Sequence, residues 1–556
     1  MASVALAHIA RAQGLAGTVL DSVSRRPIPG VVVILLDSTG ATVARHLTNE
    51  RGEYLVVLRD AMRSARFVRI GFRPGEVPIP PRAESPTRLD VTMFALPSMM
   101  QLVRVVANSR CSVRKDRAGA MGLWEQARAG LLATIVARES NPAMLHRLGF
   151  ERVMDGNSDR IESMRVRGDS ADTAATTFFA AHTAQDLVRY GFSTDSTSAG
   201  TFFGPDADVL LNDYFAGAYC FELSNGSRER PNQVGLRFVP SEHRRGRIDI
   251  DGTLWIDTLA RALKNIEFKY VGMSEGAVRF RPGGRISFRA MSNGIVLIDR
   301  WSLRLVSAQP DTIVNAKGSL EARNWLYADE TGGELAGAAW PDGIAWKAPL
   351  GALRIQAIDH EGRPAAGSVV ALAATHYFGI VDSRGLVEIK NLLPGPYAVR
   401  IIDPQVAELG IGLPTSLRFV AARDTTSLAR LLVPTAKQFA IERCAAAGQR
   451  TFGGGAFAVL GRVVTSRGEP VKDAKITVAT RMQLPQSDGS NLVWLKDYWT
   501  TGSDGLFQSC HNWDLQNEIV IRVHRYGAAD VLVDGQFKSD LMVVRIPVPP
   551  VARADP

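Results

Sequence analysis

A strand, a turn that ends in proline and a second strand occur three times in this chain, and this repeat constrains the fold most. The copies are GTVLDSVSRRPIPGVVVILLD at residues 17–37, LRIQAIDHEGRPAAGSVVALAA at 353–374 and VLGRVVTSRGEPVKDAKITVAT at 459–480. Their turns end at Pro27, Pro364 and Pro470. Each copy opens with an alternating strand and resumes with small and β-branched residues, as burial on one sheet face requires.

A second turn follows in each copy, within TNERGEYLVVL, VDSRGLVEIKNL and TGSDGLFQSC. Gly52, Gly385 and Gly505 occupy equivalent places in these turns. Glycine there is typical of a hairpin tip with positive φ, where a Cβ would be strained. Another apolar strand ends each copy, so every copy is predicted to form a small two-sheet sandwich.

The first copy carries a longer pattern of glycine, aspartate, β-branched and aromatic residues. Its members are Gly17, Val19, Asp21, Pro27, Ile28, Gly30, Val31, Val33, Thr48, Asn49, Glu50, Gly52, Glu53, Tyr54, Val68, Arg69, Gly71 and Phe72. This pattern resembles the carboxypeptidase regulatory-like domain, a transthyretin-like (prealbumin-like) β-sandwich. The resemblance covers residues 14–108 well, 457–550 moderately and 349–435 weakly, where Ile355 replaces the leading glycine.

The resemblance implies passive modules rather than catalytic ones. Such domains accompany zinc carboxypeptidase domains, the N-termini of TonB-dependent receptors and bacterial surface proteins, and they fall among the carbohydrate-binding-like folds. It therefore assigns no catalytic residue. The expected fold class is mainly β and multidomain, with Ig-like or transthyretin-like sandwiches around a central α+β domain that contains an antiparallel sheet.

The segment between the first two sandwiches follows a different pattern. Residues 123–139 place apolar side chains on one helical face, and a second helix is expected at 184–190, closed by Gly191. We therefore divide it into a helical or mixed connector, 109–200, and an antiparallel sheet domain, 201–348.

Part of the expected sheet, residues 252–268, faintly resembles the curved half-barrel of bacterial lipoprotein-carrier proteins. This resemblance implies an apolar groove for a lipid or acyl chain. The alternative, which we favour, is a closed core. A ligand pocket would be lined by three tryptophans of this region, Trp255, Trp301 and Trp325.

The remaining segments are short. Residues 1–13 contain an apolar stretch and an A-x-A-like end that fit a signal peptide remnant, although a disordered cytoplasmic N-terminus is the alternative. Residues 436–456, with three consecutive glycines, are expected to be a linker, and 551–556 a tail. No stretch approaches the 18 apolar residues of a membrane span.

The four cysteines lack C-x-x-C spacing, which argues against a zinc ribbon or a redox pair. In an exported chain they would form two disulfides, and we pair Cys444 with Cys510 and Cys111 with Cys220 because each pair brackets one region. Four buried free thiols are the alternative.

Charge and motifs exclude several function classes. The net charge of +9 is scattered, with its densest knot at residues 244–247, so neither a basic stripe nor a reader motif indicates nucleic-acid binding. The sequence lacks the H-E-x-x-H and Walker A motifs, and none of its nine histidines begins an H-x-x-E pair. Two acidic groups could offer oxygens to calcium, but turn and strand-face roles compete. They are Asp206, Asp208, Asn212 and Asp213, and Asp249 with Asp251.

These observations favour a non-catalytic, exported bacterial envelope protein, periplasmic, outer-membrane-associated or extracellular, that binds or scaffolds through its sandwiches. We expect no cofactor and no metal, and partners among envelope proteins, glycans or lipids. The alternatives are a carbohydrate- or lipid-binding protein with a groove in the central domain, and a hydrolase whose site is assembled from distant residues.

Overall fold

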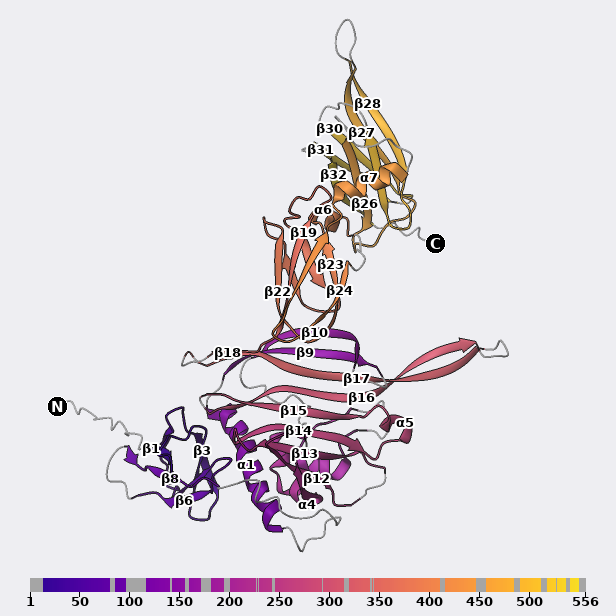
Figure 1. Cartoon of the computed structure of the whole chain (residues 1–556). Helices are drawn as coiled ribbons and strands as arrows, with labels where there is room; N and C mark the ends of the chain where they lie inside the picture. The colour runs from indigo at the N-terminus through magenta and orange to yellow at the C-terminus, as the bar shows by residue number, and fades with distance from the viewer. Residues whose placement is uncertain are drawn as a thin grey trace, which may run out of the picture. The chain divides into compact units, whose positions relative to one another are not determined.

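The chain is mainly β and multidomain, as predicted (Figure 1). It divides into two compact units, Met1–Ala348 and Pro349–Pro556. Among the residues that the structure describes, no helix is long and apolar enough to cross a bilayer. The computed structural model describes residues 14–80, 86–96, 117–140, 143–155, 160–171, 182–194, 201–226, 228, 230–242, 246–292, 294–314, 320–340, 343, 345–410, 416–446, 457–484, 491–511, 518–526, 528–536 and 541–549.

The first sandwich packs two sheets against each other. In one sheet β1 pairs antiparallel with β4 and parallel with β7 and β8, and the other has the order β3-β2-β5-β6. Alternate residues such as Leu15, Val19, Val33 and Phe67 form the core between the sheets. The strands are β1 (Gly14–Asp21), β2 (Val32–Leu36), β3 (Thr42–Leu47), β4 (Glu53–Val57), β5 (Ser64–Val68), β6 (Gly75–Pro78), β7 (Thr87–Arg88) and β8 (Val91–Met93).

The second sandwich repeats this strand order, with sheets β22-β19-β25 and β21-β20-β23-β24. Its first strand again pairs antiparallel on one side and parallel on the other. Its elements are β19 (Gly351–Ile358), β20 (Val369–Leu372), β21 (Phe378–Ile380), β22 (Leu386–Leu392), β23 (Gly395–Ile402), α6 (Pro404–Glu408), β24 (Leu417–Ala421) and β25 (Thr426–Leu432).

The third sandwich has sheets β29-β26-β32 and β28-β27-β30-β31, the same order once more. Helix α7 (Ala436–Ala446) precedes it and packs with α6 on the outer face of β26 and β32. Its strands are β26 (Phe457–Thr465), β27 (Lys475–Leu484), β28 (Asn491–Thr500), β29 (Leu506–His511), β30 (Glu518–His524), β31 (Val531–Gln536) and β32 (Leu541–Val548).

The turns of the three sandwiches agree in detail. Each proline of the first turn forms an isolated bridge to the preceding strand: Leu20 with Pro27, Ile358 with Pro364 and Val464 with Pro470. The tip glycines adopt positive φ, 68° at Gly52, 80° at Gly385 and 71° at Gly505. A Cβ on Gly52 would lie 2.7 Å from the carbonyl oxygen of Val19, so both backbone angle and space require glycine.

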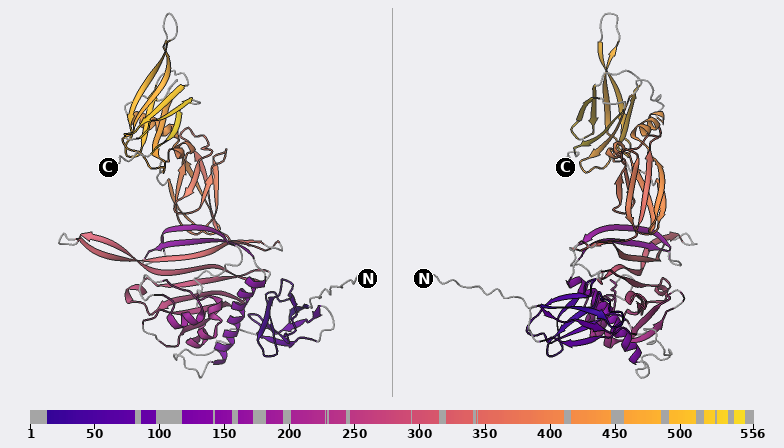
Figure 2. Two further views of the ribbon diagram at one scale, coloured as in Figure 1. Left: turned by 180° about the vertical axis from the view of Figure 1, so that it is seen from behind. Right: turned by 60° about the vertical axis from the view of Figure 1, so that its left-hand side comes forward.

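One antiparallel sheet with the order β10-β9-β17-β16-β15-β14-β13-β12-β11 forms the central domain, and β18 adds to β17. Helix α1 lies between this sheet and the first sandwich (Figure 2). The elements are α1 (Arg117–Ser140), β9 (Met144–Met154), β10 (Ile161–Ala171), α2 (Ala184–Tyr190), α3 (Ala207–Leu210), α4 (Asp213–Ala218), β11 (Tyr219–Asn225), β12 (Gln233–Pro240), β13 (Asp249–Asp257), β14 (Ala262–Val271), α5 (Glu275–Val278), β15 (Gly283–Ala290), β16 (Val296–Val314), β17 (Leu320–Ala339) and β18 (Ala345–Lys347).

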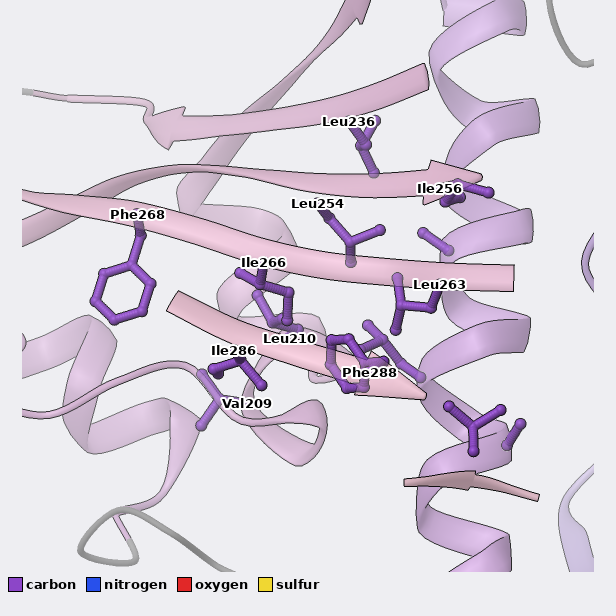
Figure 3. Close-up of a cluster of buried hydrophobic side chains, with 14 of the residues drawn as sticks. Val209, Leu210, Leu236, Leu254, Ile256, Leu263, Ile266, Phe268, Ile286 and Phe288 are labelled. Carbon is purple, nitrogen blue, oxygen red and sulfur yellow. The ribbon is translucent and has the colours of Figure 1, made fainter. Parts of the chain in front are cut away.

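Helices cover the inner face of this sheet. Alternate strand residues, among them Leu236, Leu254 and Ile266, point toward Val209 and Leu210 of α3 and toward α1 (Figure 3). All of these side chains are buried. The side chains of the chain itself therefore fill the face on which a lipid groove would lie, and this arrangement fits the closed core.

Two expected boundaries differ from the structure. Strands β9 and β10 lie within residues 109–200, yet β9 pairs with β17 in the central sheet, so the sheet crosses the predicted division at 200. The expected linker 436–456 contains helix α7, and the three glycines lie outside the described residues. The expected helices are present, and Gly191 closes the second with φ 98°.

Candidate functional surfaces

Helix α1 seals the outer face of one sheet of the first sandwich. Val32 and Val68 on that sheet share a hydrophobic cluster with Leu123 and Leu131 of the helix. Trp124 at the start of the helix packs on Phe221 of β11, with ring centroids 4.6 Å apart. The helix is thus the core element that joins the sandwich to the central sheet, and Trp124 is a packing residue.

Buried polar contacts fix the position of the sandwich on the helix. Gln126, only 3% exposed, accepts a hydrogen bond from the backbone N–H of Gly71 at 2.7 Å and donates to the carbonyl of Phe72 at 3.3 Å. Because unpaired polar groups are costly when buried, this contact sets one register of helix against sandwich. Arg66 of β5 lies 3.7 Å from Glu125 of the helix and adds a half-exposed ion pair.

A second contact joins the sandwich to the β13–β14 turn. Arg69 donates through Nε to the carbonyl of Pro29 at 3.0 Å and through Nη1 to that of Arg261 at 3.4 Å. Burial lowers the pKa of the Arg69 guanidinium, and the charge of Arg261 lowers it further. Glu50 accepts from the Ser292 hydroxyl at 3.0 Å. The first sandwich therefore packs against the central domain through buried contacts and is not a separate surface module.

The expected tryptophan pocket is not formed. Trp255 pairs with Asn265, whereas Trp301 pairs with Ile286, one position further along the neighbouring ladder. Because side chains alternate, the two rings lie on opposite faces of the sheet, Trp301 against the inner core and Trp255 under Arg230. Trp325 lies in β17, but its side chain is outside the described residues.

Ion pairs occupy the outer face of the central sheet. Asp251 accepts hydrogen bonds from Arg237 at 3.0 Å and lies 3.1 Å from Lys269. Burial opposes ionisation of Asp251, but these two cations outweigh it and hold the pKa of its carboxyl below its ordinary value. Arg230 pairs with Glu267 at 2.6 Å. These carboxylates are ionised partners of arginine and lysine, which is a structural role.

The acidic groups considered for calcium serve as helix caps and strand partners. Asp206 and Asn212 accept backbone N–H bonds at the starts of α3 and α4. The carboxylate of Asp249 accepts from the Tyr219 hydroxyl at 3.3 Å. Within the described ranges, no group of three or more His, Cys, Asp or Glu side chains is placed to hold a metal ion.

Cys444 of α7 and Cys510 of β29 form a disulfide with a Cα separation of 6.1 Å. This bond ties the helix to the third sandwich beside Ala440 and Leu460. Cys220 is also disulfide-bonded, and Cys111, the partner expected for it, lies outside the described residues. None of the cysteines that the structure describes is free.

The second unit presents exposed aromatic and aliphatic side chains. In the second sandwich Phe378 and Ile380 of edge strand β21 are 69% and 64% exposed. In the third, Trp494 and Tyr498 of edge strand β28 are 45% and 72% exposed. Sequence reasoning missed these surfaces because it assigned apolar strand residues to sandwich interiors. What could have indicated these surfaces is the presence of large apolar residues in strands at the edge of a sheet, which have a neighbouring strand on one side only.

Residues 14–94 match the carboxypeptidase regulatory-like domain family, which covers the first sandwich. The chain thus contains such a domain, as the sequence pattern predicted. No curated protein matches the chain.

Several solved structures are similar at low identity. They include the TIE protein of Bacillus anthracis (11% identity, 60% of this chain and 58% of that chain, TM-score 0.15) and a streptococcal ancillary pilin (12%, 48% and 81%, 0.15). The shaft pilin SpaA of Lactobacillus rhamnosus GG matches at 8%, over 37% of this chain and 100% of its own, with a TM-score of 0.15. The chain spans little more than half of the TIE protein. At these TM-scores the similarities carry no argument about function.

Proposed function

We propose that this chain is a non-catalytic, exported bacterial envelope protein that binds or scaffolds partners through its regulatory-like sandwiches. The observation that carries the proposal is a contrast between equivalent sheets. The outer face of β3-β2-β5-β6 is covered by helix α1, whereas Phe378, Ile380, Trp494 and Tyr498 leave the equivalent faces of the other two sandwiches with exposed apolar surface. Exposed patches of this kind mark interaction sites.

The disulfide bonds support the proposal that the chain is exported to an oxidising compartment. Cys444 is bonded to Cys510, and Cys220 is bonded as well. Such bonds persist in oxidising compartments, including the bacterial periplasm and cell surface. Together with the apolar N-terminal stretch, they favour export.

Site-specific photo-crosslinking in intact cells tests the proposal. A photoreactive residue replaces Phe378 or Trp494 in the full chain, and the control carries it at Val23, an 86% exposed loop position. We expect envelope-fraction adducts from the first two positions and none from the third. Recovery of the chain in the cytosol, or no adduct from either test position, would contradict the proposal.

Enzyme assays test the non-catalytic part. Catalysis needs a poised nucleophile, acid, base or metal in a concave site, whereas the acidic groups described above are engaged in ion pairs and caps. We expect the purified protein to release no C-terminal amino acids from peptides, with or without zinc. Turnover that is lost on chelation and restored by zinc would overturn this reading.

A second candidate function, carbohydrate binding, rests on β28. Trp494 and Tyr498 lie four residues apart on one face of this strand, about 13 Å along it. Trp494 lies opposite Arg481, which forms an ion pair with Glu518 at 2.8 Å, so this face combines an apolar ring with polar groups. Glycan-array binding that disappears in Trp494→Ala and Tyr498→Ala would favour this function over protein binding.

A further inference from the structure

The outer face of the sheet β21-β20-β23-β24, here called the second outer face, is apolar and open. Phe378, Ile380 and Val420 are 69%, 64% and 71% exposed. Val369 lies opposite both Ile380 and Ile402, and Val369 and Ile402 are partly exposed, whereas Val420 lies further along the sheet, opposite Pro396. A cluster of this kind on a folded domain is unusual unless something covers it.

The first sandwich shows what covers the equivalent face. Its strands pair in the same register, so Val32 opposite Val68 corresponds to Val369 opposite Ile402, and Leu47 opposite Val32 corresponds to Ile380 opposite Val369. Beneath helix α1, Val32, Val68 and Leu47 are only 0%, 7% and 8% exposed. The same positions are therefore buried by a helix in one sandwich and open in the other.

A charged position is equivalent as well. Arg66 lies opposite Ile34 in the first sandwich, and Arg400 lies opposite Ala371 in the second. Arg66 lies 3.7 Å from Glu125 of helix α1. Arg400 is exposed on the second outer face, where a carboxylate of a covering helix would meet it.

The third sandwich shows that the fold does not require an apolar surface here. At the positions of Val369, Ile380 and Ile402 it has Lys475, Thr500 and His524. Strand β27 accordingly begins with the alternating sequence KITVAT, whereas β2 and β20 read VVILL and VVAL. Continuous apolar runs are typical of strands that are covered on both faces. Strand β20 thus has the sequence of a covered strand, whereas Phe378 and Ile380 beside it are exposed among the residues that the structure describes.

We propose that the second outer face binds an amphipathic helix of a partner protein. The helix would lay aliphatic side chains on Val369, Ile380 and Ile402 and bring a carboxylate to Arg400, as α1 does on the first sandwich. This names the kind of partner for the binding function proposed above and rests on it. A second copy of this face fits less well, because a two-fold contact would bring Arg400 and Arg418 of both copies together.

A peptide with the sequence of residues 117–140, helix α1 itself, is the probe. It is labelled with fluorescein and titrated with the full chain, and anisotropy reports binding. We expect saturable binding that Ile380→Lys weakens at least tenfold, since a buried lysine loses the apolar contact and stays charged. The matched variant Thr500→Lys, at the equivalent position of the third sandwich, should leave binding unchanged.

A charge exchange tests the orientation of the helix. Arg400→Glu should weaken binding about two- to fivefold, as expected for a partly exposed ion pair. A peptide with Glu125→Lys should recover that loss. Circular dichroism and an intact Cys444–Cys510 bond establish that each variant is folded.

Three results would overturn the proposal. The first is the absence of saturable peptide binding, and the second is an equal loss of peptide affinity in Ile380→Lys and Thr500→Lys. The third is binding of the chain to vesicles of phosphatidylethanolamine and phosphatidylglycerol, abolished by Ile380→Lys, while the peptide fails to bind. The photo-crosslinking experiment in cells tests the binding function independently of the helix. Adducts from position 378 without peptide binding would refute the helix and keep the binding function, and peptide binding without adducts would refute the cellular function alone.

Discussion

The first and second sandwiches share strand order, register and turn chemistry, yet they use the outer face of the same sheet in opposite ways. In the first, Val32 and Leu47 belong to a core that continues through helix α1 into the central sheet. In the second, Ile380 and Phe378 at the same edge are exposed. The interior of the sandwich is therefore the constant part of this fold, and its outer faces carry the differences between domains.

The third sandwich extends the comparison to its other sheet. Residues on the outer face of β26, Ala458 and Leu460, are buried under α6 and α7. Arg462 of the same strand donates to the carbonyls of Leu409 and Gly410 at the end of α6. The first sandwich thus buries the outer face of β3-β2-β5-β6 and the third buries that of β26 and β32, whereas Phe378 and Ile380 of the second are exposed within the part of the chain that the structure describes.

Exchanging one residue between equivalent faces should give the largest effect. Val32→Lys, which introduces the residue found at Lys475, puts a charge beneath helix α1, so the first unit should lose about 3 kcal/mol or more. Val369→Lys faces solvent and should cost the second unit about 1 kcal/mol or less. Hydrogen exchange of β5 and of β23, followed by mass spectrometry, measures the two effects separately. Equal losses would show that both faces are covered.

Removing the disulfide should give the next largest effect. Cys444→Ala with Cys510→Ala releases α7 from the third sandwich, which should lower its stability by about 2 to 4 kcal/mol. The first unit should be unaffected, since the bond lies within the second. Peptide mapping of the unreduced wild-type protein should find the two cysteines linked. A free thiol at Cys444 in protein from the envelope would contradict this prediction.

Much of this architecture could be predicted from local sequence. Pro27 and Gly52, with their counterparts, mark turns whose backbone requirements are local, and the three sandwiches follow from them. The membership of β9 in the central sheet could not be predicted. Its partner β17 lies more than 170 residues away, and periodicity contains no information on pairing at that distance.

The missed surfaces have a related cause. The alternation rule predicts burial of one strand face only, whereas the unbroken apolar run VVVILL from Val31 to Leu36 indicates burial on both faces. The three consecutive glycines predict a linker over residues 436–456, whereas the structure has helix α7 in that segment. Ala436, Ala440 and Cys444 recur every four residues, which is the spacing of one helical face. Trp255 and Trp301 lie on opposite faces because the pairing register from β13 to β16 decides which face each ring occupies, and periodicity contains no information on that register.

A buried threonine of the first sandwich allows a comparison with the second at a single position, where a smaller effect is expected. The hydroxyl of Thr48 accepts from the N–H of Val31 at 2.9 Å and donates to the carbonyl of Ile28 at 2.7 Å. In the second sandwich Val381 takes its place, and the equivalent N–H of Ser368 bonds directly to the carbonyl of Ala365 at 3.2 Å.

Thr48→Val should therefore cost the first sandwich about 1 to 2 kcal/mol, because it leaves a buried donor and acceptor without their partner. Val381→Thr should change the second by less than about 0.5 kcal/mol, since its backbone groups already pair. Denaturant unfolding followed at each sandwich by hydrogen exchange measures both. A clear stabilisation by Val381→Thr would show that the direct bond in the second sandwich is weaker than its distance implies.

The smallest expected effect is a pH dependence of stability that the first sandwich has and the second lacks. His46 of β3 lies opposite Val33, on the interior side of the first sandwich, where the second has Gly379 opposite Val370. Burial lowers the pKa of the His46 imidazole. The unfolded chain therefore binds a proton at higher pH than the folded one, and stability present above the unfolded pKa of about 6.5 is lost as pH falls below it. Unfolding of the first sandwich should become easier between pH 7 and pH 5, while His46→Gln should remove this dependence and leave the second sandwich unchanged. An unaltered pH profile in His46→Gln would assign the acid sensitivity to another group.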